Sequence, residues 1–333
     1  MDNRNQENNR NQENNRRQEN NRRQENKRNQ ETGLKGENSL TQERKLKLAV
    51  IGTGLIGCSM AGGLRDIASE IIGVDNNTVH LQEALSRGLI DRSMPLENAL
   101  NGADMVLVTV PVDATIKLLP EILDRIGPLS VVIDAGSVKS AVCRSTEDHP
   151  KRAQFVAAHP MAGLAVSGPD ASDARIFQNR KVIVCEQDKS SSRALKTASA
   201  IFEKLGMHIV YLTPDIHDAI VARVSHLPQV VAYCLAALIA EDSPGGGKAA
   251  ENETISAIAS TGFESSTRLA SSPANMWIPI FQHNNEKLSA SLDDMIRLLS
   301  DLRSMIQTEQ WESLADLIVK ANKARKDFLT GFK

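Results

Sequence analysis

The chain has 333 residues, a formal net charge of −2 and only 3% aromatic residues. This composition argues against a nucleic-acid-binding protein, in which basic residues usually gather on one surface. The longest apolar run, residues 227–240, is too short to span a bilayer, and the N-terminus has no apolar signal-peptide segment. The four cysteines form no CxxC pair, which is typical of reduced thiols and not of a zinc site. We therefore expect a cytoplasmic protein with no metal, membrane or nucleic-acid partner.

The first 44 residues differ from the rest of the chain. A hexapeptide close to RNQENN repeats from Arg4 to Gly33, and this stretch contains no apolar side chain. With nothing to bury, the segment cannot offset the entropy lost on ordering. An arginine-bearing arm for an anionic partner is the alternative, but a glutamate follows each arginine or arginine pair. We predict that residues 1–44 form a disordered tail, and that a chain starting near Thr41 keeps full activity.

After Lys45, short apolar runs alternate with stretches of helical periodicity. The predicted strands are residues 46–52, 70–75, 104–110, 130–134, 155–158, 181–185 and 208–212. The predicted helices between them are residues 55–64, 78–87, 113–126 and 191–205. Such alternation is typical of βαβ units, which build a parallel sheet with helices on its faces. We therefore predict an α/β domain with a doubly wound, Rossmann-type parallel sheet over residues 45–213.

The pattern changes after Pro214, where no further strand is predicted. Residues 215–241, 284–308 and 311–329 carry apolar residues at helical spacing, and residues 244–247, PGGG, interrupt the region. We therefore predict that residues 214–333 form a second, all-α domain, which also offers a surface for dimerisation.

A glycine-rich motif, G-x-G-x-x-G, runs from Gly52 to Gly57 between a predicted strand and a predicted helix. The three glycines permit a tight turn, a close approach of the backbone to a pyrophosphate, and close helix–strand packing. Asp75 ends the next strand, where a carboxylate can bind ribose hydroxyls and repel a 2′-phosphate. Asn76 and Asn77 follow in place of an arginine, so we expect NAD and not NADP. The candidate cofactor residues are Gly52, Gly54, Leu55, Ile56, Gly57, Asp75, Val110 and Pro111.

Two polar residues follow later strands and are candidates for the chemistry. His159 lies in AHPMAG, and Ser137 lies in DAGSVK. In an open α/β sheet, the carboxyl ends of the strands face the ligand crevice. A dehydrogenase needs a base at that place, and a histidine can supply one. Alternatively, His159 has only a structural role, and Ser137 caps the N-terminus of a helix.

The helical half contains further candidates. His226 and Gln229 lie in SHLPQ, where polar groups interrupt an apolar helix start. Arg268 lies among small and apolar residues, and such an arginine either forms a structural salt bridge or binds a carboxylate. Trp277 is one of two tryptophans and is otherwise a core aromatic.

Taken in order, GTGLIG, VTVPV, DAGSVK, AHPMAG, SHLPQ and TGFESSTRLA resemble the prephenate/arogenate dehydrogenases of tyrosine biosynthesis. The resemblance extends from about residue 46 to the C-terminus. It implies an NAD-dependent oxidative decarboxylation in which His159 takes the proton of the substrate hydroxyl and Ser137 orients His159. It also implies that Arg268 binds a substrate carboxylate and that the enzyme is a homodimer. The residues it implies for the shape of the pocket are His226, Gln229, Trp277 and Asn284.

Two positions depart from the family pattern. Ala165 stands where the pattern often has a glutamate, and Gln229 where it often has a histidine. No acidic side chain is evident for the ammonium group of arogenate, so we predict a prephenate dehydrogenase. An arogenate dehydrogenase is the first alternative. A different two-domain dehydrogenase of the 3-hydroxyacid type is the second, but such enzymes use a lysine from the helical half, and residues 214–247 contain none.

Overall fold

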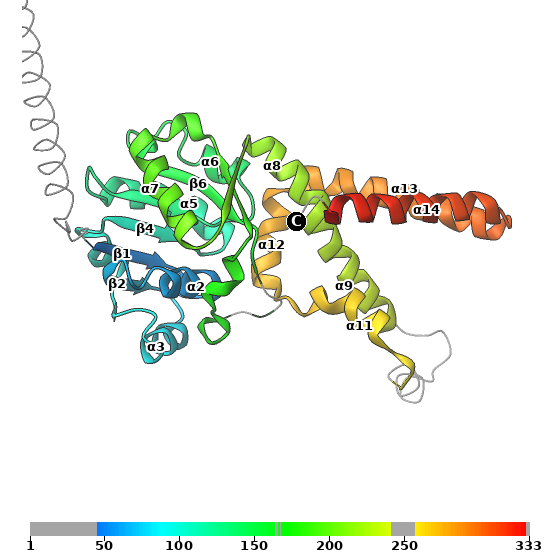
Figure 1. The fold of residues 1–333 in the computed structure, drawn as a ribbon, viewed down its shortest axis with the longest axis horizontal. Coiled ribbons are helices and arrows are strands. Elements are labelled where there is room, and N and C mark those ends of the chain that lie inside the picture. Colours follow the sequence, from blue (N-terminus) through cyan, green and yellow to red (C-terminus); the bar gives the residue numbers. More distant parts are fainter. Residues whose placement is uncertain (1–44, 164–165, 167, 241–256, 331–333) are drawn as a thin grey trace, which may run out of the picture. The chain divides into compact units, whose positions relative to one another are not determined.

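The computed structural model describes residues 45–163, 166, 168–240 and 257–330. The predicted tail, the PGGG break and Ala165 lie outside these residues. The described elements begin with β1 (Leu46–Ile51), the first strand of a large sheet (Figure 1).

The sheet has eight strands in the order β3-β2-β1-β4-β5-β6-β7-β8. The strands after β1 are β2 (Ala68–Val74), β3 (Arg92–Ser93), β4 (Met105–Val108), β5 (Val131–Asp134), β6 (Phe155–Pro160), β7 (Lys181–Cys185) and β8 (His208–Leu212). All pairings from β3 to β6 are parallel, and β1 pairs with both β2 and β4. The order therefore reverses beside β1, which makes this the point where a doubly wound sheet binds its ligand.

Both faces of the sheet are covered. The helices of this half are α2 (Leu55–Gly63), α3 (Thr78–Ser86), α4 (Leu96–Leu100), α5 (Val112–Arg125), α6 (Ser140–Arg144) and α7 (Ser192–Lys204). Along β1, Leu48 and Val50 belong to one buried cluster, whereas Ala49 and Ile51 belong to another. A strand that is buried on both faces reads as a continuous apolar run, which is why β1 was evident in the sequence. The Rossmann-type prediction is confirmed.

The strands that follow β6 in the sheet are not all parallel to their neighbours. Strand β7 runs antiparallel to β6, and β8 is parallel to β7. In the described part of residues 161–180 there are only the short 3₁₀ turns η2 (Pro169–Ala171) and η3 (Ala174–Phe177). A parallel return to the sheet normally needs a crossover helix. The chain therefore turns back beside β6, whereas α7 carries it from β7 to β8 in the parallel sense.

Beyond Leu212, the described residues form helices and no strand, as predicted. They are α8 (Pro214–Val221), the π-helical turn η5 (Ala222–His226), α9 (Leu227–Ala240), α11 (Thr261–Thr267), the 3₁₀ turn η6 (Arg268–Ser271), α12 (Ala274–His283), α13 (Asn285–Gln307) and α14 (Trp311–Thr330). The sequence pattern missed α11 and α12. Both are short, and prolines stand before and inside α12, at Pro273 and Pro279.

One helical stretch, Pro214–Leu238, is long and apolar enough to cross a membrane by length and composition alone, although only 28% of its most apolar window is buried. It exceeds the apolar run seen in the sequence because α8, η5 and α9 are continuous. Asp218 of this stretch accepts hydrogen bonds from the backbone N–H groups of Lys139 and Ser140, both at 2.8 Å. These buried polar contacts make the stretch part of the folded body.

Candidate active site

The glycine loop leaves β1 at its carboxyl end. Gly52 has φ +97°, and a Cβ there would lie 2.8 Å from the carbonyl oxygen of Thr109. A Cβ on Gly57 would lie 2.0 Å from the carbonyl oxygen of Gly52. Gly54, in contrast, has nothing within 4 Å of such a Cβ, and no side chain caps the start of α2. The loop thus leaves open space at a helix N-terminus, where backbone N–H groups favour a phosphate.

Asp75 links this loop to the end of β2. Its Oδ2 accepts hydrogen bonds from the backbone N–H and the hydroxyl of Thr53, at 2.7 and 3.1 Å. Its Oδ1 accepts from the backbone N–H of Asn77 at 2.8 Å. A carboxylate has about four lone-pair sites, so Asp75 can hold the loop and still accept from a ribose hydroxyl. The residues around the loop therefore fit a dinucleotide.

The other candidates lie at the same edge of the sheet. Strands β1, β4, β5 and β6 are parallel neighbours, so their carboxyl ends meet at one edge. Val110 and Pro111 follow β4, and Pro111 is the N-cap of α5. Ser137 follows β5, and His159 lies near the end of β6. The topology thus brings the cofactor loop, Ser137 and His159 to the same edge.

His159 is buried and joined to a second histidine that the sequence analysis did not select. Its Nδ1 lies 2.8 Å from Nε2 of His217, and Nδ1 of His217 lies 2.7 Å from Oδ1 of Asp218. Within the described part of the chain, Nε2 of His159 has no hydrogen-bond partner. Ser137 is half-buried and makes no hydrogen bond to His159. The contact that orients His159 here is the one with His217.

Burial sets the protonation states of this cluster. Desolvation, followed by the proximity of His217, Lys139 and His226, holds the pKa of His159 well below its usual value. Burial likewise lowers the pKa of His217, although the bond to Asp218 opposes this effect. Burial alone would raise the pKa of Asp218, but hydrogen bonds from His217 and Ser140 and from backbone N–H groups bring it below its usual value. At neutral pH the two histidines are therefore neutral and Asp218 is ionised.

A buried ion pair holds the backbone behind the cluster. Lys139, which is fully buried, pairs with Asp134 and donates to the carbonyl oxygen of Ala158 at 2.7 Å. Asp134 also accepts from the backbone N–H groups of Gly136 and Ala158, both at 2.9 Å. Burying two charges is costly unless their remaining hydrogen bonds are made. Here both oxygens of Asp134 and two of the three Lys139 N–H donors have partners. These bonds tie the loop with Ser137 to the strand with His159.

The helical half adds a second group of buried polar residues. Nδ2 of Asn284 lies 3.2 Å from Nδ1 of His226 and donates to the carbonyl oxygen of Asp218 at 2.9 Å. The ring of Trp277 meets that of His226 edge-on, with centroids 6.0 Å apart. Nε2 of His226 and Nε1 of Trp277 are buried and have no hydrogen-bond partner among the described residues. Unpaired buried polar atoms are costly, so this pair of nitrogens points to a polar ligand.

Arg268 and Gln229 lie where α9 meets η6. The side-chain amide of Gln229 is buried and donates to the carbonyl oxygen of Leu269 at 2.7 Å, while the Tyr233 hydroxyl donates to that of Ser272 at 2.7 Å. These bonds tether the turn that carries Arg268. The Arg268 side chain is exposed and forms no ion pair within the described ranges. It remains available to an anionic ligand.

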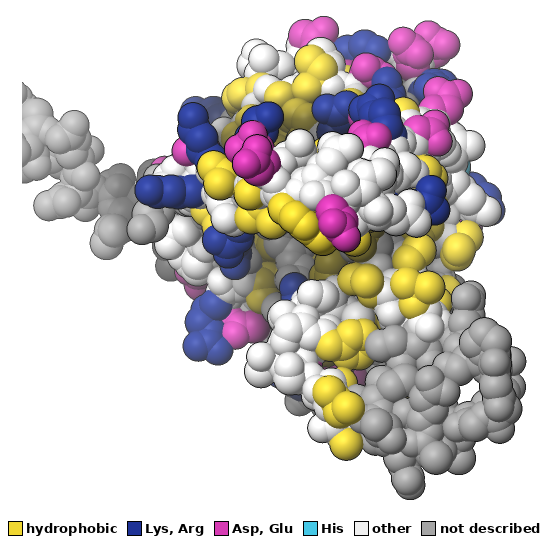
Figure 2. All heavy atoms as spheres, turned by 90° about the vertical axis from the view of Figure 1, so that its right-hand side faces the viewer, with side chains coloured by type: hydrophobic (Ala, Val, Ile, Leu, Met, Phe, Trp, Pro, Cys, Tyr) yellow, Lys and Arg dark blue, Asp and Glu magenta, His cyan; other side chains and the backbone are white. Residues whose placement is uncertain are grey.

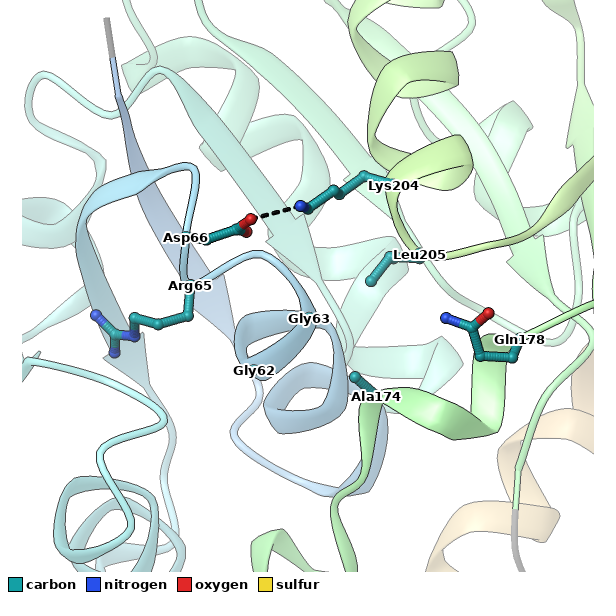
Figure 3. A pocket seen from close by; sticks show the side chains of 8 residues that line it. All are labelled: Gly62, Gly63, Arg65, Asp66, Ala174, Gln178, Lys204 and Leu205. Carbon is teal, nitrogen blue, oxygen red and sulfur yellow. Dashed lines mark hydrogen bonds and ion pairs between the residues drawn. The ribbon is translucent and has the colours of Figure 1, made fainter. Parts of the chain in front are cut away.

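A cavity of about 420 Å³ lies elsewhere, between the end of α2, η3 and α7 (Figure 3). Asp66 and Lys204 pair across it at 2.5 Å. Helix α2 starts at the carboxyl end of β1, so its last residues, Gly62 and Gly63, lie away from the edge that carries His159. No candidate site residue lines this cavity, and we do not assign the chemistry to it.

The arrangement can perform acid–base chemistry beside a bound dinucleotide. A neutral histidine with one free ring nitrogen is a general base. Sequence reasoning missed His217, Asp218 and the Lys139–Asp134 pair, whereas the resemblance had implied a place in the pocket for Asn284. The signal available for the first two was the adjacent His-Asp pair in the middle of α8.

Comparison with known proteins agrees with this geometry. The family model described as prephenate dehydrogenase, nucleotide-binding domain, matches residues 60–211, and the one described as prephenate dehydrogenase, dimerization domain, matches residues 213–320. Prephenate dehydrogenase of Bacillus subtilis is 30% identical over 296 residues, which are 87% of this chain and 76% of that protein. Cyclohexadienyl dehydrogenase of Zymomonas mobilis is 28% identical, over 84% of this chain and 94% of that protein.

Solved structures agree as well. Prephenate dehydrogenase of Aquifex aeolicus, in complex with hydroxyphenyl propionate and NAD+, has a TM-score of 0.75 and 26% identity, over 84% of this chain and 97% of that one. Synechocystis arogenate dehydrogenase has a TM-score of 0.68 and 28% identity, over 85% and 100%. The two family models adjoin and together match most of the chain, and the Bacillus subtilis relative is 30% identical over 76% of its own length. The chain belongs to the prephenate dehydrogenase family.

Proposed function

We propose that the protein is an NAD-dependent prephenate dehydrogenase of tyrosine biosynthesis, which converts prephenate to 4-hydroxyphenylpyruvate. Membership of the family supports the reaction. One observation carries the assignment to this site. His159 lies at the sheet edge that also carries the glycine loop, and among the described residues its Nε2 has no hydrogen-bond partner.

The glycine loop and Asp75 would hold the cofactor. The open space over Gly54 and the uncapped start of α2 suit the pyrophosphate, and Asp75 suits the ribose hydroxyls. When bound, NAD+ supplies the hydride acceptor. Comparing catalytic efficiency with NAD and NADP tests the assignment, and a preference for NADP would contradict the role of Asp75.

His159 would act as the general base. Its Nε2 takes the proton of the ring hydroxyl while the carbinol carbon gives up hydride, and loss of carbon dioxide leaves an aromatic ring. Ser137 lies on the adjacent loop and would bind the same hydroxyl. The electron pair of the broken C–C bond moves through the ring to the former carbonyl oxygen. That oxygen takes the proton back from His159, which leaves the histidine neutral again.

The helical half would bind the rest of the substrate. Arg268 forms no ion pair with any described residue, and its guanidinium suits a carboxylate because its fork of N–H groups matches two oxygens. His226 and Trp277 offer two buried nitrogens that have no partner within the described part of the chain, and Gln229 holds the turn that carries Arg268. These polar groups suit the keto-acid side chain of prephenate.

Absorbance at 340 nm tests the function directly. Purified protein should reduce NAD+ when prephenate is added. Absence of any absorbance change with both prephenate and arogenate would refute the proposal. The similarity to Synechocystis arogenate dehydrogenase favours arogenate as the second candidate substrate. Comparing the catalytic efficiencies for the two substrates separates them, and a preference for arogenate would contradict the substrate assignment.

Three further expectations belong to this proposal. The protein is a homodimer, which the description of the second family model as a dimerization domain supports. It divides into a cofactor domain, residues 45–213, and a helical substrate domain, residues 214–333, which the adjoining limits of the two family models support. Its cytoplasmic location stays a prediction from the composition.

A further inference from the structure

We infer that His217 and Asp218 are positioning residues that hold His159 in the one neutral tautomer able to act as a base. The inference rests on the proposed function, because it assigns His159 the role of general base. Both residues belong to α8: His217 contacts His159, and Asp218 contacts His217. Neither needs to touch the substrate.

The three side chains form a buried chain of hydrogen bonds. His217 and Asp218 are 1% and 2% exposed, and the two bonds that connect the three residues are 2.8 and 2.7 Å long. The rings of His159 and His217 meet edge-on, with centroids 5.1 Å apart. Water does not compete for hydrogen bonds at this depth. Each bonded ring nitrogen must therefore have one fixed role, either donor or acceptor, and every donor must face an acceptor.

The position of each proton follows from the acceptor at the end of the chain. The ionised carboxylate of Asp218 can only accept, so Nδ1 of His217 carries a proton. Since His217 is neutral, its Nε2 has a lone pair and accepts from His159. Nδ1 of His159 is therefore the donor, and the lone pair of His159 lies on Nε2. No described residue makes a hydrogen bond to that nitrogen, so its lone pair can take a proton.

Backbone contacts keep Asp218 fixed in this role. Its Oδ1 accepts from the N–H of Lys139 as well as from His217, and its Oδ2 accepts from the N–H of Ser140. When His159 gains a proton, its Nδ1–H remains bonded to the lone pair of His217. The charge that develops on His159 is thus stabilised without movement, as in hydrolase triads whose third residue orients the base.

A metal site explains the cluster less well. Two nitrogen ligands of one tetrahedral zinc ion lie about 3.3 Å apart, which is longer than a hydrogen bond. The facing nitrogens of His159 and His217 are 2.8 Å apart. The other charged or titratable groups near the two rings are Lys139, Asp134 and His226, and Lys139 is already paired with Asp134.

Two substitutions of His217 separate positioning from structure. In His217→Asn, the amide replaces Nδ1 and can still donate to Asp218, but nothing reaches His159. In His217→Gln, the amide reaches the position of Nε2. Its NH₂ group favours the side of Asp218, so its oxygen faces Nδ1 of His159 and can accept.

We expect His217→Asn to lower kcat for prephenate by about 10- to 100-fold with little change in KM, the scale on which groups that orient a reacting residue act. His217→Gln should restore most of the kcat that the Asn variant loses. Thermal unfolding of both variants checks that they fold. The inference is overturned if the Asn variant keeps wild-type kcat, or if the Gln variant is as impaired as the Asn variant.

Nitrogen NMR tests the tautomer without any turnover. In ¹⁵N-histidine-labelled full-length protein at neutral pH, the ring signals of His159 are assigned by their loss in His159→Asn. We expect Nδ1 to be protonated and Nε2 unprotonated, and the reverse pattern would overturn the inference. A wild-type protein that reduces no NAD+ with either substrate would refute the proposed function, whereas the NMR result would still decide the positioning of His159.

Discussion

At the scale of single residues, the protonation states of the buried histidines govern what the site can do. His159, His217 and His226 all have pKa values lowered mainly by burial. A base must be unprotonated before the reaction, and lowering the pKa of His159 ensures this at neutral pH. Because burial disfavours the protonated form, each of these histidines lowers the stability of the folded protein in acid.

Replacing His159 by Asn removes the base but not the network. The Asn amide can still donate to His217, so we expect the fold to persist. Turnover should fall by roughly 10²- to 10⁴-fold, the usual contribution of a general base, with little change in KM. Steady-state kinetics with prephenate measures both constants. Near-wild-type kcat in this variant would remove His159 from the role of base.

Arg268→Ala should act on binding and not on turnover. Losing a charge-assisted bond to a carboxylate raises KM by roughly 10- to 100-fold, whereas kcat changes little. Arg175→Ala is the matched control, because Arg175 of η3 is also exposed but pairs with Asp173, the N-cap of that turn. An unchanged KM in Arg268→Ala, or an equal rise in the control, would remove Arg268 from the site.

The stability of the protein should decrease in mild acid because of His226. Burial lowers its pKa to about 4, so below pH 6.5 the unfolded chain takes up a proton that the folded chain refuses. Between pH 7 and pH 5 this residue alone should cost about 2 kcal/mol of unfolding free energy. Urea unfolding at the two pH values measures the loss.

The control for this experiment is an exposed histidine. His226→Gln should reduce the difference in stability between pH 7 and pH 5, whereas His208→Gln, at an exposed position of β8, should leave it unchanged. An equal pH dependence in wild type and His226→Gln would show that His226 is not the group responsible.

At the scale of elements, the glycine loop separates what the fold needs from what the cofactor needs. A side chain on Gly57 would collide with the backbone of Gly52, whereas one on Gly54 would enter open space. Gly54→Ala should therefore fold normally but raise KM for NAD, and Gly57→Ala should lower the unfolding temperature. Calorimetry and kinetics on both variants check this. Equal effects of the two substitutions on stability would contradict the separation.

Some helices and strands could be predicted from the sequence, and others could not. Strand β1 and helix α5 were evident because one is apolar throughout and the other has a regular apolar face. The antiparallel direction of β7 was not evident, because the residues of a strand do not show whether it runs parallel or antiparallel to its neighbour. The π-helical turn η5 was not evident either. It places His226 at the end of one extra-wide turn, a distortion that is frequent at functional sites.

At the scale of the whole molecule, the helical region leaves apolar surface exposed. On α13 and α14, Ile296, Leu299, Ile318, Val319 and Phe328 are all more than half exposed. Figure 2 shows hydrophobic side chains gathered in several groups on the face it presents. Apolar areas of this kind usually mark an interface. A second copy of the chain fits, because the helical region matches a dimerization domain.

Charges introduced on α14 should prevent the proposed dimer from forming. Light scattering on the wild type should give twice the chain mass of 36.3 kDa. The double substitution Ile318→Glu with Val319→Glu should shift the mass toward one chain, because two unpaired carboxylates would be buried at the interface. Lys320→Ala, beside them on the same exposed helix, should not. A monomeric wild type would refute the dimer.

The sequence by itself determined the alternating elements, the glycine loop and the family, because these depend on residues close together in the chain. It also selected His159 from a short motif at a strand end. Only the tertiary structure decided what holds His159. His217 lies 58 residues away, and Asp218 is fixed by backbone N–H groups 78 and 79 residues away. Which buried groups meet over such separations depends on how the α8 helix packs against the sheet, and no local pattern encodes that packing.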